Sequence, residues 1–170
     1  MTSPTPTAHR LYAAVQDPKP QAVVIHCSDP RFQSAFEQFI TDELHLAKGE
    51  YIPIVVGGGA GVLGHPEQLP KEFKFLKERL ELYRTTFPTV RRVILINHEN
   101  CHYYDSLKLK ALAHLGQHLK AMLDEAHEDL SLVSRVFAQL LSHLGYTVEL
   151  YYARFADAEH SKVVFEKAGG

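Results

Sequence analysis

The sequence predicts an α/β fold in which helices flank a mainly parallel central sheet. Four short apolar runs lack the polar alternation of a half-exposed strand, which is typical of strands buried on both faces. These runs lie at 22–25, 51–56, 93–96 and 148–153. Segments with the apolar spacing of helices separate them, and this alternation is the pattern of a parallel sheet with crossover helices. The 170 residues suit a single domain with an adequate core.

The first strand is preceded by a segment that we expect to be separate from the core. Residues 1–20 are predicted to form an N-terminal arm, and 21–170 a single domain. Within the arm, 1–7 is a Thr- and Pro-rich tail, and 8–16 has the length of a short helix that the following Asp-Pro-Lys-Pro run would break. Because the arm is too short to bury itself, we expect it to pack across a second subunit.

Helices are expected between the strands. At 32–46 and 67–87, large apolar residues recur every three or four positions, so they share one helix face that can pack on the sheet. Two more helices are expected at 106–126 and 131–144. A last apolar run at 162–165 fits a short edge strand.

Composition and charge exclude several classes of function. The formal net charge is -2 and the charges are mixed along the chain, so no basic stripe predicts binding to nucleic acid or to an anionic membrane. No apolar run has the length of a transmembrane helix, and the first ten residues lack the apolar core of a signal peptide. We therefore expect a cytoplasmic protein. Its two cysteines are too few for a disulfide framework.

Three motifs whose residues could bind a ligand or take part in a reaction follow three of the predicted strands. Cys27-Ser-Asp-Pro-Arg31 follows the first strand, the glycine-rich segment 57–61 follows the second, and His98-Glu-Asn-Cys101 follows the third. In open α/β sheets, ligands bind in the crevice outside the carboxyl ends of the strands. Residues that are distant in sequence are therefore expected to meet at one edge of the sheet.

Cys27, His98 and Cys101 form a ligand set suited to zinc. His98 and Cys101 are three positions apart on a tight turn and can reach one ion, which Cys27 would complete. Two thiolates and an imidazole suit zinc, and three protein ligands leave a fourth position for water. Any one of these residues alone is better explained by packing. The three together predict about one zinc ion per chain.

Asp29 and Arg31 are the second candidate pair. Side chains two apart in an extended segment point the same way, and Pro30 favours extended geometry at Asp29. An arginine partner keeps a carboxylate ionised and fixed in direction. Beside a metal, Asp29 could accept a hydrogen bond from water or take the fourth coordination position. Taken alone, the pair could equally be a structural ion pair at the start of the next helix.

Together these residues resemble the β-class carbonic anhydrases. The Cys-x-Asp-x-Arg motif after the first strand and the His-x-x-Cys motif after a later strand look like the two motifs of that family. Between them, Ala60-Gly61 is similar to the family's Ala-Gly loop. The resemblance runs from about Gln21 to Phe165.

The resemblance implies an activity and an assembly. The zinc ligands would be Cys27, His98 and Cys101. Asp29 and Arg31 would be the catalytic pair, which orients a zinc-bound hydroxide for the reversible hydration of carbon dioxide to bicarbonate. The family fold also implies an antiparallel C-terminal edge strand, and a homodimer or a dimer of dimers.

Three alternatives remain open at this point. The same zinc chemistry could act on another small electrophile, such as carbonyl sulfide or carbon disulfide. The protein could instead be a non-catalytic zinc-binding relative in which Asp29 permanently fills the fourth position. A redox switch is the third alternative, in which Cys27 and Cys101 form a disulfide when the metal is lost.

Two departures from the family pattern predict a remodelled substrate pocket. Gly58-Gly59 stands where the family has Arg-Asn, and His102-Tyr103-Tyr104 stands where the family keeps small residues. We expect a coupled exchange, in which a tyrosine fills the volume that the glycines leave empty. Carbon dioxide hydration would then be measurable but slow. Alternatively, both tyrosines turn outward and pack on the next helix.

Overall fold

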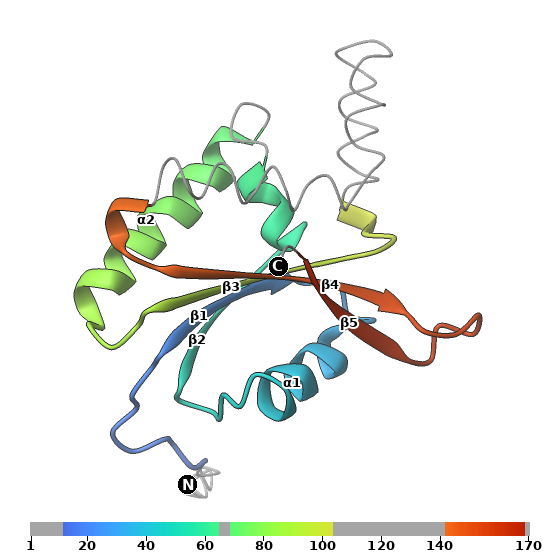
Figure 1. The fold of residues 1–170 in the computed structure, drawn as a ribbon, viewed down its shortest axis with the longest axis horizontal. Coiled ribbons are helices and arrows are strands. Elements are labelled where there is room, and N and C mark those ends of the chain that lie inside the picture. Colours follow the sequence, from blue (N-terminus) through green and yellow to red (C-terminus); the bar gives the residue numbers. More distant parts are fainter. Residues whose placement is uncertain (1–11, 65–68, 104–141, 169–170) are drawn as a thin grey trace, which may run out of the picture.

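A computed structural model describes residues 12–64, 69–103 and 142–168 of the chain (Figure 1). The strands are β1 (Ala22–Cys27), β2 (Tyr51–Val56), β3 (Arg92–His98), β4 (Thr147–Phe155) and β5 (Val163–Ala168). The α-helices are α1 (Gln33–Asp42) and α2 (Pro70–Thr86), and two 3-10 helices are η1 (Gly59–Gly64) and η2 (Ser142–Leu144). No helix in these ranges is long and apolar enough to cross a bilayer.

The strands form one five-stranded sheet in the order β2-β1-β3-β4-β5. Neighbouring strands are parallel from β2 to β4, and β5 returns antiparallel to β4 at the edge. The predicted fold class is therefore confirmed, including its antiparallel edge strand. In this order β1 lies between β2 and β3, so the loops that follow these three strands meet at one edge of the sheet.

Helices cover both faces of the sheet. Figure 1 shows α1 on one face, with α2 and η1 on the other. Every residue of β1 is buried, because alternate side chains enter a core under α1 and a core under α2. This two-sided burial explains why the strands are continuous apolar runs in the sequence.

The helix boundaries differ from the predicted ones for local reasons. The expected helix at 8–16 is wrong over 12–16, where the chain is irregular and Tyr12 is exposed, so no packed face supports a helix. α1 ends at Asp42 because the chain turns at His45, which has a positive φ of 53°. α2 begins at Pro70, a favourable residue for the first turn.

Two expected helices are not described. The segment 106–126 and residues 131–141 lie outside the described ranges, and only residues 142–144 at the end of the second helix are seen, as η2.

An ion pair ties β3 to β4 at the start of both strands. The Arg92 Nε donates a hydrogen bond of 2.7 Å to Glu149, and the Tyr151 hydroxyl donates one of 3.0 Å to the same carboxylate. The Glu149 side chain is only 15% exposed. The hydrogen bond from Arg92 is the main reason that the pKa of Glu149 lies below its usual range.

Glu149→Gln is expected to reduce the free energy of unfolding by about 1 kcal/mol at neutral pH. Because the folded-state pKa of Glu149 is depressed, its contribution is present above the unfolded pKa and is lost as the pH falls through the folded pKa. Urea unfolding at pH 7 and pH 3 measures the difference in free energy of unfolding between the variant and the parent. This difference should shrink at the lower pH. Glu159→Gln, at an exposed position, is the control. An equal difference between Glu149→Gln and the parent at both pH values would contradict the assignment.

Candidate metal centre

Three buried side chains meet at the carboxyl ends of β1 and β3. Cys27 is the last residue of β1, His98 is the last residue of β3, and Cys101 follows on the turn after His98. Their ligand atoms all lie within 4.8 Å of one another, and the two Sγ atoms are 3.6 Å apart. The structure therefore brings together the three residues that the sequence predicts as metal ligands.

The orientation of His98 suits a metal ligand. Its Nδ1 lies 2.8 Å from the backbone carbonyl of Glu99, and since a carbonyl can only accept, Nδ1 carries the proton. The lone pair is then on Nε2, which is buried and makes no hydrogen bond. A buried acceptor without a partner is costly, and a metal ion would satisfy it. The ring is held against Phe32, with centroids 4.3 Å apart.

The surroundings of Cys27 favour its thiolate form. Its pKa is lowered chiefly by a hydrogen bond from the Cys101 thiol, which outweighs the opposing effect of burial. The backbone amide of Asp29 also donates to the Cys27 sulfur and lowers the pKa further. The thiolate is the form that binds metals, so this environment would suit metal binding at Cys27.

Asp29 and Arg31 form the direct pair expected from their spacing. The Nη2 of Arg31 donates to Oδ2 of Asp29 at 2.6 Å, and Nε donates to Oδ1 at 3.0 Å. The Asp29 side chain is only 5% exposed, and the hydrogen bonds from Arg31 hold its pKa below the usual range. Among the described residues, Asp29 is not part of the three-residue cluster that could hold a metal.

Arg31 also makes a contact that sequence analysis missed. Its Nη2 donates a second hydrogen bond, of 2.6 Å, to the backbone carbonyl of Asn100, the residue before Cys101. Asn100 has a positive φ of 51°, a conformation that asparagine tolerates better than most residues. One guanidinium therefore links the Asp29 carboxylate to the turn that carries Cys101.

Glu99 is a second residue whose role the sequence did not reveal. Its amide donates to the Ala153 carbonyl at 3.0 Å, and its carboxylate accepts a hydrogen bond from the Phe155 amide. Glu99 thereby fixes the end of β3, and with it His98, against β4. A polar residue between the two ligands of a His-x-x-Cys motif was the only signal of this role.

The glycine-rich segment comes very close to Cys27. Gly59 has a positive φ of 53°, and a Cβ atom there would lie 2.8 Å from the Cys27 amide nitrogen and 3.1 Å from the Ile96 carbonyl oxygen. These neighbours are backbone atoms of the central strands and cannot turn aside. Only glycine satisfies both the conformation and the space.

Gly59→Ala is expected to destabilise the protein by about 2 kcal/mol or more, because it adds a backbone collision to the cost of a positive φ. It should also weaken metal binding, since the collision is with Cys27. Gly145→Ala is a matched control, because Gly145 has a φ of 66° but a Cβ atom there would have no neighbour within 4 Å. Thermal unfolding and zinc titration of both variants are the measurements. Equal effects would contradict the role given to the contact.

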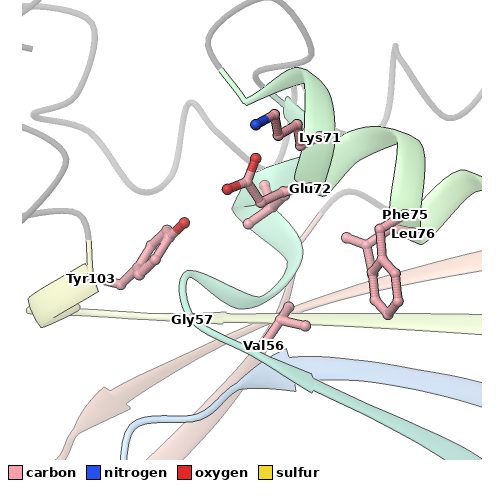
Figure 2. A pocket seen from close by; sticks show the side chains of 8 residues that line it. Val56, Gly57, Lys71, Glu72, Phe75, Leu76 and Tyr103 are labelled. Atoms are coloured by element: carbon pink, nitrogen blue, oxygen red, sulfur yellow. The ribbon is translucent and has the colours of Figure 1, made fainter.

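A cavity of about 280 Å³ lies beside the cluster of Cys27, His98 and Cys101. Figure 2 shows it between Tyr103 and the first turns of α2. The Tyr103 ring packs against Cys27 and Cys101 and also lines the cavity. Burial, followed by the charge of Glu72, raises the pKa of Tyr103. Tyr103 thus faces the site, as one tyrosine was expected to do, and Tyr104 lies outside the described residues.

Comparisons with known proteins give a distant structural similarity. No protein-family model and no curated protein matches the sequence. Among solved structures, the chain is similar to a tetrameric β-carbonic anhydrase from the filamentous ascomycete Sordaria macrospora, with a TM-score of 0.46 and 14% sequence identity. The similarity covers 89% of this chain and 82% of the other.

Proposed function

We propose that this chain binds one zinc ion through Cys27, His98 and Cys101 and catalyses the reversible hydration of carbon dioxide to bicarbonate. The observation that carries the proposal is the buried, unpartnered Nε2 of His98 beside two thiols that lie 3.6 Å apart. Two sulfur donors and one imidazole nitrogen are a donor set that favours zinc. The three-ligand count is that of catalytic rather than structural zinc sites.

The Asp29–Arg31 pair gives the site a means of orienting its nucleophile. Zinc held in such a site would lower the pKa of a coordinated water molecule from about 16 to about 7. Asp29, which Arg31 keeps ionised and fixed, accepts a hydrogen bond from the attacking water and sets its direction toward carbon dioxide. Arg31 serves as the positioning residue for this carboxylate. The rings of Phe32 and Tyr103, which pack against the ligand residues, limit the access of other water molecules.

The proposal extends to the organisation of the chain. Residues 21–170 would act as one zinc-binding domain, and residues 1–20 as an arm that packs on a second subunit of a cytoplasmic homodimer. Light scattering of the purified chain at micromolar concentration tests the assembly, and a monomer would contradict it.

Stopped-flow measurement of carbon dioxide hydration, paired with metal analysis of protein purified without added metal, tests the activity. We expect about one zinc per chain and hydration above the buffer rate, lost on chelation and restored by zinc. A chain that binds zinc but does not hydrate carbon dioxide would be either a non-catalytic zinc protein or an enzyme for another electrophile. Assays with carbonyl sulfide and carbon disulfide distinguish these two. Protein that cannot bind zinc would overturn the whole proposal.

A further inference from the structure

The Tyr103 ring occupies the space that side chains at positions 57 and 58 would fill. A Cβ atom at Gly57 would lie 2.6 Å from Cδ2 of this ring, and one at Gly58 would lie 2.6 Å from Cδ1. Both edges of the ring therefore rest on the glycine backbone. The sequence led us to expect such an exchange of volume at Gly58-Gly59. The ring fills the space beside Gly58 and Gly57, whereas a Cβ atom at Gly59 would meet backbone atoms of Cys27 and Ile96 instead.

The same ring contacts two neighbouring sites. It packs against Cys27 and Cys101, and it also lines the cavity of about 280 Å³. The remaining lining is largely apolar, includes two charged residues, and comes from the end of β2 and the glycine after it, from η1 and from α2: Val56, Gly57, Val62, Lys71, Glu72, Phe75 and Leu76. Figure 2 shows the Tyr103 hydroxyl directed toward Glu72, while Phe75 lies at the opposite end of the cavity.

The size of the cavity exceeds the need of the proposed substrate. A water-sized molecule takes up about 30 Å³, and a molecule of three heavy atoms takes up little more. The cavity approaches the lower limit of pockets that hold drug-sized ligands, about 300 Å³. An apolar space of this size would admit an aromatic ring to the metal if nothing stood between them.

We propose that Tyr103 is a specificity-determining residue. Its ring forms a wall between the cluster of Cys27, His98 and Cys101 and this cavity, and it restricts the bound metal to ligands of a few atoms. The inference rests on the proposed zinc site and deepens it, because it assigns the substrate class as small and linear. The wall depends on the absence of side chains at Gly57 and Gly58. Removing the ring, or pushing it away, is expected to join the cavity to the metal.

Three variants test the wall. Tyr103→Ala removes the ring, whereas Tyr103→Phe keeps it and is the matched control. Gly57→Ala moves the ring without altering it, because the new methyl group would collide with Cδ2. Gly57 is not among the glycines with a positive φ, so this substitution adds no backbone strain.

The readout is ligand binding to the cobalt(II)-substituted protein, which does not require activity. Visible absorption reports binding of thiocyanate, a linear anion of three atoms, and of phenylimidazole, which carries a bulky ring. We expect all four proteins to bind thiocyanate with similar affinity. Phenylimidazole should bind Tyr103→Ala and Gly57→Ala at least about tenfold more tightly than the parent or Tyr103→Phe.

The outcomes separate the two proposals. A parent protein that takes up no cobalt would overturn the metal site and the wall with it. A parent that takes up cobalt and binds phenylimidazole as tightly as the two alanine variants would overturn the wall alone. If Tyr103→Ala does not fold, Gly57→Ala decides the question in the same assay.

Discussion

Replacing Cys101 with serine is expected to remove most of the bound zinc. The two sulfur atoms and the His98 nitrogen form one buried cluster, so a serine hydroxyl would leave an incomplete donor set. The loss of affinity should exceed the roughly 10- to 100-fold loss that is typical when an outer-shell partner of a metal ligand is removed. Elemental analysis of the purified variant and titration against a competing chelator measure the effect.

Histidine substitutions supply the control for this prediction. His98→Asn should lose zinc as Cys101→Ser does, because it removes the buried Nε2. His45→Asn changes an exposed histidine outside the cluster, and asparagine tolerates the φ of 53° found there. It should therefore keep the zinc of the parent. Stoichiometric zinc in both Cys101→Ser and His98→Asn would show that the cluster is not the metal site.

The sheet and the meeting of the three motifs could be predicted from sequence. Apolar runs without alternation identified the buried strands, and the bounds of β2 coincide with the run at 51–56. Because the carboxyl ends of parallel strands share one edge, the positions of Cys27 and His98 after their strands were sufficient to bring them together. The spacing of Asp29 and Arg31 likewise predicted their pairing.

The remaining features of the site depend on contacts between residues that are distant in the chain, and no local sequence pattern encodes such contacts. The bond from Arg31 to the Asn100 carbonyl joins two turns that are 69 positions apart in the chain. The contact of Gly59 with the Cys27 backbone is known only when η1 is placed over the sheet. The departures from the family pattern indicated an exchange of volume between a tyrosine and the glycines, but the three-dimensional arrangement was needed to show that Tyr103 takes part in it.

Asp29→Asn is expected to lower kcat/KM for carbon dioxide hydration by about 100-fold or more while leaving zinc bound. Asparagine has nearly the same size, so it fits the buried position, but it carries no charge and its amide group cannot accept both hydrogen bonds from Arg31. The nucleophile would then lose the carboxylate that orients it. Stopped-flow kinetics with metal analysis measure both quantities in one preparation.

Two comparisons make the Asp29 result specific to catalysis. Asp42→Asn alters an exposed carboxylate at the end of α1, and it should match the parent in rate and in zinc content. Thermal unfolding of Asp29→Asn shows whether a lower rate reflects lost orientation of the water or lost folded protein. We expect the variant to stay folded, because Arg31 is partly exposed and can be solvated when its partner becomes neutral. A folded, zinc-loaded Asp29→Asn protein with the kcat/KM of the parent would show that the pair is structural and that the attacking water is oriented by another group.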